Sequence, residues 1–259
     1  MPPEMHVWNG ERAQLGQWRD LDGVAVITVR PGDLPPSPAF VHHCCDSLRD
    51  AGFRVVVTPA LSPAEIGPYL EAGFREREQL HVLICDLQRP PQRGRGQPPP
   101  PGVEYRRSRA TDLPATLAVD HAAFDRFWSF DRDALLEACG ATPQSRFRVA
   151  VAATNPVLAE RGFAPGDVVG YCITGRSRYQ GFLQRLAVAP QAQGLGIGRE
   201  LVWDAVRWLA RRRSRSCVVN TQETNERARV LYETCGFSIA PAGLYVLEHD
   251  LVADRGAVI

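Results

Sequence analysis

Residues 183–199 read LQRLAVAPQAQGLGIGR, and the rest of the chain is organised around this stretch. The apolar run Leu186-Ala187-Val188 is short enough for a buried strand, and Pro190 ends it. The glycine-rich segment Gln193–Arg199 follows, and after it apolar residues recur at spacings of three and four, which is typical of one buried helix face. The order predicted is therefore a strand, a glycine loop and a helix. The apolar helix positions are Leu201, Ala205, Trp208 and Leu209.

The glycine loop has the features of a phosphate-binding turn. The first amides of a helix have no acceptor inside the helix, and the helix dipole adds partial positive charge at the same place. Glycine lets a phosphate approach these amides without interference from a Cβ atom, so Gly196 and Gly198 suit a pyrophosphate. A tight turn from strand to helix, with no ligand, explains the same glycines.

Two common nucleotide-binding motifs are excluded. The dinucleotide fingerprint G-x-G-x-x-G, begun at Gly194, requires a glycine where this chain has Arg199. The phosphate loop of NTPases requires a lysine, and all 30 basic residues of this chain are arginine. A diphosphate held here would therefore belong to another class of ligand.

A second pattern of strand and helix lies downstream. The apolar run Cys217-Val218-Val219 predicts a short strand, and Asn225 is placed to cap the helix that follows. Gly236 can end that helix in the left-handed conformation, which returns Phe237 to the core. The helix face predicted to be buried carries Ala228, Leu231 and Tyr232.

Together the two patterns resemble the GNAT superfamily of acyl-CoA-dependent N-acetyltransferases. The first, Gln193-x-x-Gly196-x-Gly198, is similar to the pyrophosphate loop of that family. The second, Asn225-x-x-Ala228-x-x-Leu231-Tyr232-x-x-x-Gly236-Phe237, is similar to its next helix, where the tyrosine lies near the thioester sulfur. The resemblance extends from Val103 to Leu251 and implies a mixed α/β sheet with the GNAT acyl-CoA N-acyltransferase fold.

The first part of the chain repeats the latter half of this pattern. At one constant offset, Gly73-Phe74 matches Gly236-Phe237, and Tyr69 matches Tyr232. We therefore expect a partial, degenerate GNAT-like half-domain, then a proline- and glycine-rich linker, RPPQRGRGQPPPPG, and then a catalytic N-acetyltransferase domain. The predicted boundaries are 1–88, 89–102 and 103–259.

The first copy lacks the glycine loop. In its place, Arg30–Pro36 contains prolines, which have no amide hydrogen to donate, and Asp33, which would repel a phosphate. We expect no acyl-CoA to bind there, and we expect Tyr69 to be a packed residue.

The resemblance implies direct attack of an amine on the thioester of acetyl-CoA. The backbone of the strand before the loop would bind the pantetheine arm as another strand would. Tyr232 is the candidate catalytic residue that stabilises or protonates the leaving sulfur, although a core tyrosine on an apolar helix face is the alternative. The residues expected to bind the cofactor are Leu186, Ala187, Val188, Gln193, Gly194, Leu195, Gly196, Ile197, Gly198, Arg199, Asn225 and Tyr232.

The base and the acceptor site are less well defined. Many family members place a glutamate on the strand that leads into the loop, but here that strand carries Gln184 and Arg185. The remaining candidates for a base are Asp120, His121 and Glu223.

The segment 120–128 lies where the family builds its acceptor wall. A predicted helix from Thr111 to about Phe127 places Phe124 and Trp128 on one face, and with Asp120 they would bind a cationic amine. Packing of a core and charge on a solvated helix face explain the same residues.

The composition limits the class of partner. A formal net charge of +1 gives no reason to expect a nucleic-acid or membrane surface. The arginines of 211–215 favour compensation of a helix dipole, with a contact to the 3′-phosphate of CoA as the alternative. No apolar run reaches the roughly 18 residues of a membrane helix.

The number and spacing of the cysteines indicate a reducing compartment, and the spacing of the histidines and cysteines argues against a metal site. Seven cysteines without regular spacing, and no secretory leader, predict a cytoplasmic protein. The cluster His42–Cys45 invites a metal interpretation, but adjacent residues point in different directions and no spaced pair completes a tetrahedral site.

These observations predict an acetyl-CoA-dependent N-acetyltransferase whose acceptor is a small-molecule or peptide amine. We expect a monomer or homodimer. One alternative is a catalytically silent module that binds acyl-CoA, because the usual glutamate is missing. The other is that residues 1–88 form an interaction domain for a protein partner or a second copy of the chain.

Overall fold

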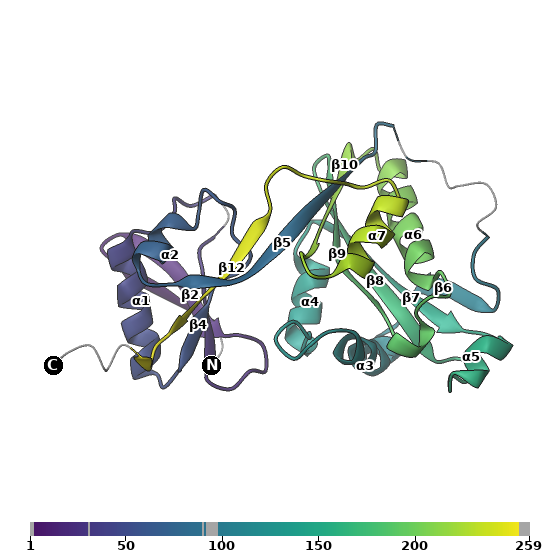
Figure 1. Cartoon of the computed structure of the whole chain (residues 1–259), viewed down its shortest axis with the longest axis horizontal. Coiled ribbons are helices and arrows are strands. Elements are labelled where there is room, and N and C mark those ends of the chain that lie inside the picture. Colours follow the sequence, from purple (N-terminus) through teal and green to yellow (C-terminus); the bar gives the residue numbers. More distant parts are fainter. Residues whose placement is uncertain (1–2, 31, 90, 92–97, 254–259) are drawn as a thin grey trace. The chain divides into compact units, whose positions relative to one another are not determined.

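The computed structural model describes residues 3–30, 32–89, 91 and 98–253, which form two compact units (Figure 1). Part of the predicted linker, at 90 and 92–97, lies outside the described residues. Strand β5 (Arg75–Asp86) contributes residues to both units, which divide it after Val82. Unit 1 consists of Met1–Val82, Gln222–Thr224 and Ala240–Ile259, and unit 2 of Leu83–Thr221 and Asn225–Ile239.

The last strand of the chain belongs to unit 1. Strand β12 (Leu244–Asp250) lies between β4 (Val55–Val57) and β5, and it is antiparallel to both. Its Leu247 is buried in the core of unit 1. The predicted boundaries differ from the structure here, because 103–259 would have included this strand and 1–88 would have lacked it. Without β12, the edges of β4 and β5 would leave backbone groups unpaired.

Unit 1 is a sheet that packs against two helices, with strand order β1-β2-β3-β4-β12-β5. The sequence missed its first two strands. In the second of them only Ala13, Leu15 and Gly16 are buried, so the inward side offers few large apolar residues to detect. The remaining elements are β1 (Glu4–Trp8), β2 (Glu11–Gln17), β3 (Val24–Thr28), α1 (Pro38–Asp50) and α2 (Gly67–Glu71).

The predicted match between Tyr69 and Tyr232 is visible in the local geometry. The amide of Phe74 donates to the carbonyl of Tyr69 at 3.0 Å, and the amide of Phe237 donates to that of Tyr232 at 3.1 Å. The glycine before each phenylalanine is left-handed, with φ of +85° or +88°. The ring centroids lie 5.4 Å apart in the first pair and 5.7 Å apart in the second. Both segments therefore end a helix in the same way.

Unit 2 is built on the strands β10-β9-β8-β7-β6, with the end of β5 beside β10. The strand β9 is antiparallel to β8 and parallel to β10. The elements are β6 (Val103–Arg107), η1 (Ala110–Asp112), α3 (Leu113–Ala123), α4 (Arg132–Gly140), β7 (Gln144–Ala152), α5 (Pro156–Glu160), β8 (Val168–Ser177), β9 (Gln180–Val188), η2 (Pro190–Ala192), α6 (Ile197–Arg211), β10 (Ser216–Gln222), α7 (Glu226–Thr234) and β11 (Ser238–Ile239).

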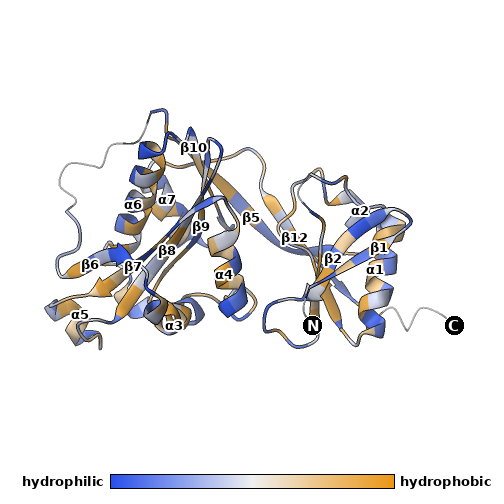
Figure 2. Ribbon diagram, turned by 180° about the vertical axis from the view of Figure 1, so that it is seen from behind, coloured by the Kyte–Doolittle hydropathy of each residue, from blue (hydrophilic) through white to orange (hydrophobic). Residues whose placement is uncertain are grey.

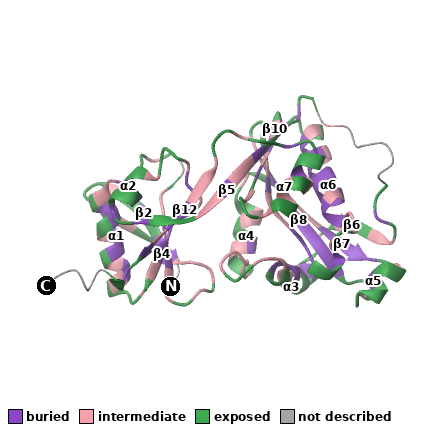
Figure 3. Cartoon of the chain, viewed as in Figure 1, coloured by how far each residue is buried: buried purple, intermediate pink, exposed green. Residues whose placement is uncertain are grey.

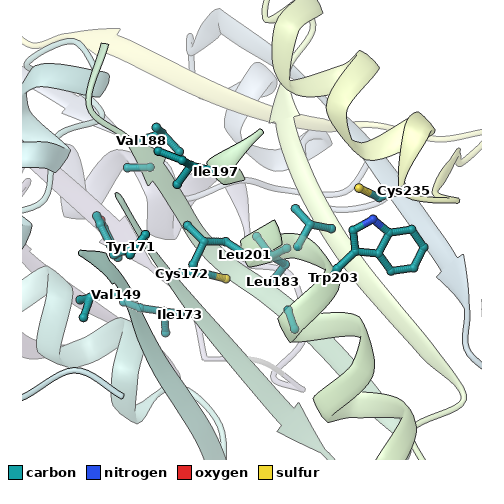
Figure 4. Packing of buried hydrophobic residues seen from close by; sticks show 14 of the residues in the cluster. Val149, Tyr171, Cys172, Ile173, Leu183, Val188, Ile197, Leu201, Trp203 and Cys235 are labelled. Atoms are coloured by element: carbon teal, nitrogen blue, oxygen red, sulfur yellow. The ribbon is translucent and has the colours of Figure 1, made fainter. Parts of the chain in front are cut away.

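Helices cover both faces of the unit 2 sheet. Tyr171 of β8 bonds to Asp120 of α3, whereas Arg146 of β7 bonds to Asp204 of α6 at 2.9 Å. Arg146 lies opposite Thr174, and residues 171 and 174 point to opposite faces because strand side chains alternate. The central strands are consequently apolar and buried (Figures 2 and 3). Figure 4 shows the packing around Leu201 of α6.

Three residues of the cluster His42–Cys45 take part in the packing of unit 1. All seven cysteines are free thiols. His43 stacks on Trp8 with ring centroids 4.7 Å apart, and Cys44 and Cys45 are buried in the core of unit 1. None of the helices in the described part of the chain combines the length and apolarity that a bilayer crossing requires.

Candidate active site

The glycine loop leaves a run of backbone amides without acceptors at the start of α6 within the described part of the chain. Gly194 and Gly196 have φ of +81° and +82°, a conformation that glycine adopts without steric cost. Gly196 directly precedes the helix. Within the described part of the chain, no amide from Gly194 to Arg199 donates to a carbonyl or side chain. We call these six residues the amide nest, and its amides together with the helix dipole suit a diphosphate.

Gly198 is required for close packing behind the amide nest. A Cβ added there would lie 3.3 Å from Leu231 Cδ2 of α7 and 3.5 Å from Val188 Cγ2 of β9. At Gly196 a Cβ would instead meet the guanidinium of Arg199 at 3.1 Å. Gly198 therefore allows α6 to approach its neighbours, and Gly196 leaves room for the side chain of Arg199.

Side chains from three segments fix the loop before the nest. Gln193 Nε2 donates to the carbonyl of Val188 at 3.0 Å, and Arg227 of α7 donates to Gln193 Oε1. Arg161, which follows α5, donates to the carbonyls of Gln191 and Gln193 at 2.9 and 3.1 Å. The sequence did not identify Arg161 or Arg227. Arg161 lies in no recognised motif, Arg227 occupies an unspecified position of the second motif, and both act across long separations.

The strands β9 and β10 separate next to the nest. Their parallel pairing runs from Ser216↔Gln180 to Val218↔Phe182 and goes no further within the described strands. A bulge coincides with the separation, since Gln184 is the extra residue between Leu183 and Arg185 in the pairing with β8. Beyond the bulge, β9 therefore presents an edge that is not paired with β10.

The register decides which predicted backbone groups face that open edge. The amide of Ala189 donates to the carbonyl of Val169 at 2.9 Å, and antiparallel pairs alternate between bonded and non-bonded. The polar backbone groups of Leu186 and Val188 consequently point away from β8, whereas those of Ala187 point towards it. Because Gln193 already occupies the Val188 carbonyl, the free groups at this edge are those of Leu186 and the amide of Val188.

Tyr232 is a buried residue of α7 with 5% of its surface exposed. Burial raises the pKa of its hydroxyl above the ordinary value. The hydroxyl makes no hydrogen bond with any residue that the structure describes. Asn225 caps the same helix, as predicted, by accepting from the amide of Ala228 at 3.0 Å. Tyr232 therefore carries a neutral hydroxyl with a proton available to donate.

Asp120 is saturated by hydrogen bonds and is fully buried. Arg185 of β9 binds both of its oxygens, at 2.8 and 2.9 Å, and the amide of Phe130 donates to one of them at 2.6 Å. The hydroxyl of Tyr171 donates to the other. The structure thus corrects the prediction that Asp120 binds a cationic amine, since its charge and lone pairs are already used.

The predicted aromatic face of the acceptor wall is wrong. Helix α3 ends at Ala123, and Phe124 is extended, with φ −122° and ψ 152°, so Phe124 and Trp128 do not share a helix face. The guanidinium of Arg185 lies 3.5 Å from the centroid of Phe124 and 3.9 Å from that of Phe130. Arg185 also donates to the carbonyl of Trp128 at 2.7 Å. The segment is therefore fastened to β9 by one arginine.

The other two candidates for a base each have a partner of their own. His121 contacts the carbonyl of Phe130 through Nε2 at 2.8 Å, which requires this nitrogen to donate. Glu223 belongs to unit 1, where it lies 3.6 Å from His81 Nδ1. In neutral His121 the lone pair then lies on Nδ1, whereas Glu223 is placed beside a histidine of unit 1.

Comparison with known proteins agrees with this geometry. Residues 120–237 match the sequence model of the Acetyltransferase (GNAT) family. The matched segment covers a little less than half of the chain. The amide nest and the helix α7, which carries Tyr232, both lie within the matched segment.

Two solved structures share the GNAT fold over nearly the whole chain. A tandem GNAT protein from the clavulanic acid biosynthesis pathway is 15% identical to this chain, with a TM-score of 0.66. The alignment covers 95% of this chain and 81% of that one. A GCN5-related N-acetyltransferase from Sphaerobacter thermophilus is 17% identical, with a TM-score of 0.62, covering 94% of this chain and 78% of that one. The fold thus includes a half-domain before the GNAT domain.

A curated relative matches a shorter part of the chain. The 5-NmdU N-acetyltransferase of Pseudomonas phage PaMx11 is 35% identical over 81 residues, which is 30% of this chain. The match spans 56% of the relative, so little more than half of that protein is represented.

The position of the arginines of 211–215 disfavours the alternative of a contact with the 3′-phosphate of CoA. Arg211 ends α6 and the others follow it, whereas the nest lies at the N-terminus of this helix. A helix of 15 residues rises about 22 Å. A 3′-phosphate whose diphosphate lay in the nest would therefore be distant from these side chains.

Proposed function

We propose that this protein is an acetyl-CoA-dependent N-acetyltransferase that acetylates a primary amine by direct attack. The observation that carries the proposal is the amide nest, Gly194–Arg199, next to the open edge of β9. The nest suits the diphosphate of CoA, and the separation of β9 from β10 suits the extended pantetheine arm. When bound, acetyl-CoA supplies an activated acetyl group.

Different residues of the chain bind the cofactor, donate a proton and position the segment beside β9. The nest amides and the Leu186 backbone bind and orient the cofactor along β9, with Gln193 holding the turn between them. Tyr232 donates the proton of its buried hydroxyl to the sulfur that leaves the acetyl group. Asp120 and Arg185 transfer no proton to the leaving sulfur and take none from the amine. They position the segment 124–130 beside β9.

The acceptor amine must lose a proton by another route. Strand β9 carries no carboxylate, and Asp120 is saturated. We propose that the acceptor reacts as the free amine, with water carrying the proton away. The rate should then follow the fraction of acceptor that is deprotonated.

A second candidate function is a silent module that binds acyl-CoA. The presence of Gln184 and Arg185 on β9, in place of an acid, favours this alternative. A screen of amines that follows free CoA distinguishes the two. The panel should include small amines, amino sugars, peptides with free N-termini, and 5-NmdU, the compound in the name of the phage relative.

The two outcomes of the screen are distinct. Release of CoA that depends on an amine, with an acetylated product seen by mass spectrometry, supports the transferase. Tight binding of acetyl-CoA with no release above the rate without amine, across the whole panel, supports the silent module.

A further inference from the structure

One end of unit 2 gathers arginines that the proposed transferase does not use. They come from the segment after β5, from the β8–β9 hairpin and from the end of α6, and all but the half-buried Arg176 are exposed. All of them are described residues of one compact unit. We call this group the arginine patch: Arg89, Arg176, Arg178, Arg211, Arg212, Arg213 and Arg215.

Printed contacts bring these segments together. The amide of Arg215 donates to the carbonyl of Tyr179 at 2.6 Å, and its guanidinium lies 4.7 Å from the centroid of that ring. Arg176 and Arg212 both donate to Gln144 Oε1, at 3.4 and 3.5 Å. The amide of Leu87 donates to the carbonyl of Arg215 at 2.8 Å, which places Arg89 beside the same edge.

The arginine patch lacks ion-pair partners among the residues that the structure describes. None of its members forms an ion pair with a carboxylate in the described part of the chain. Elsewhere in unit 2 several arginines are paired with carboxylates, for example Arg106 with Asp112 at 2.7 Å, Arg146 with Asp204 at 2.9 Å, and Arg207 with Glu200 at 2.8 Å. The positive charge is therefore concentrated at this end, although the whole chain carries a net charge of only +1.

Two arginines of the patch have a left-handed backbone, a conformation that glycine adopts with less steric strain. Arg178, in the β8–β9 hairpin, has φ +50°, and Arg213, just after α6, has φ +59°. In this region an L-residue other than glycine costs about 1 kcal/mol or more. Glycine is the usual residue one step beyond a helix end. The chain thus has arginine at two positions where the backbone conformation favours glycine.

We propose that the arginine patch binds the phosphate backbone of nucleic acid. Guanidinium groups bind phosphate through two parallel hydrogen bonds, and several segments present them together. Tyr179 is 59% exposed and can stack on a base. A membrane surface fits less well, since Tyr179 is the one large apolar side chain exposed among the described residues of the hairpin and the end of α6. The expectation of no nucleic-acid partner came from charge summed over the chain, and the patch is a local property.

The test compares the wild type with Arg178→Gly/Arg213→Gly. Both changes remove charge and also relieve a left-handed backbone, so the variant should fold at least as well. Fluorescence anisotropy would follow a labelled single strand and a duplex of about 20 nucleotides. We expect Kd to rise about tenfold or more, and the slope of log Kd against log salt to fall by about 1.5 between about 50 and 200 mM salt.

The matched control is Arg19→Gly. Arg19 also has a left-handed backbone, with φ +50°, but it lies in unit 1. This variant should bind nucleic acid as the wild type does. Acetyl-CoA binding should be unchanged in all three proteins, because the patch lies at the other end of α6 from the nest, so this proposal can fail or hold independently of the transferase.

Three results would overturn the proposal. They are no binding of either oligonucleotide at about 50 mM salt, equal affinities of the wild type and the double variant, and tighter binding to phosphatidylserine vesicles or polyglutamate than to oligonucleotide.

Discussion

Arg185 donates two parallel hydrogen bonds to Asp120, from Nε to Oδ2 at 2.8 Å and from a terminal nitrogen to Oδ1 at 2.9 Å. The carboxylate side chain is 0% exposed and the guanidinium side chain 9%. Each buried charge is therefore compensated by the other. The pair joins α3 to β9 and holds the residues that follow α3 next to the bulge.

We predict that Asp120→Asn destabilises the fold by about 3–5 kcal/mol, because it leaves the Arg185 guanidinium buried without a counter-charge. Chemical denaturation followed by tryptophan fluorescence measures the loss. The double variant Asp120→Asn/Arg185→Met should recover part of it, since neither charge then remains. Single and double variants whose effects simply add would contradict the coupling.

We predict that Gly196→Ala weakens acetyl-CoA binding by about tenfold or more, because the Cβ strains a left-handed residue of the nest and contacts the guanidinium of Arg199. The matched control is Gly162→Ala, where φ is +88° and nothing lies within 4 Å of the added Cβ. It should lose stability but keep its affinity by isothermal titration. Equal losses of affinity in both variants would count against the nest.

We predict that Tyr232→Phe lowers kcat by about 100-fold or more while KM for acetyl-CoA changes little, since only the proton donor is removed. Tyr69→Phe is the control, because Tyr69 occupies the equivalent turn of unit 1. It should leave kcat unchanged. A Tyr232→Phe variant that turns over at the wild-type rate would show that Tyr232 only packs.

We predict that kcat does not fall on the alkaline side up to about pH 9.5. Burial raises the pKa of Tyr232, so the protonated donor persists above the ordinary tyrosine pKa and is lost only above the raised one. The rate should instead rise as the acceptor amine loses its proton. An alkaline limb near about pH 8 that disappears in Tyr232→Phe would be the contrary outcome.

We predict that Leu247→Ala costs about 2–5 kcal/mol and that the damage appears in unit 1. Leu247 is 1% exposed and belongs to the core of unit 1, although it lies near the C-terminus of the chain. Hydrogen exchange should lose protection in β3 and β4 and keep it in β8 and β9. Loss of protection confined to unit 2 would mean that β12 does not support unit 1.

The sequence predicted those parts of the site in which function depends on local backbone chemistry. Gly194, Gly196 and Gly236 lie where their φ values require glycine, and Asn225 caps the helix that it precedes. Such features depend on neighbouring residues, so they are visible in a linear motif. The strand, loop and helix around them follow from the same local patterns.

What the sequence missed depends on contacts between distant residues. Asp120 meets Arg185 across 65 positions, so its charge looked available to a substrate. The residues after Ala123 were expected to continue a helix, but the contacts of Arg185 with Phe124 and Phe130 accompany an extended chain. Strand β12 was assigned to the second domain because it comes last in the sequence, whereas its partners in the sheet are β4 and β5.

A crystal structure of the protein with acetyl-CoA tests the central claim most directly. Our account predicts diphosphate oxygens within about 2.7–3.2 Å of the amide nitrogens of Gly194–Arg199, with the pantetheine arm along the Leu186 edge of β9. A cofactor bound elsewhere, or a nest whose amides remain without a phosphate at saturating acetyl-CoA, would contradict it.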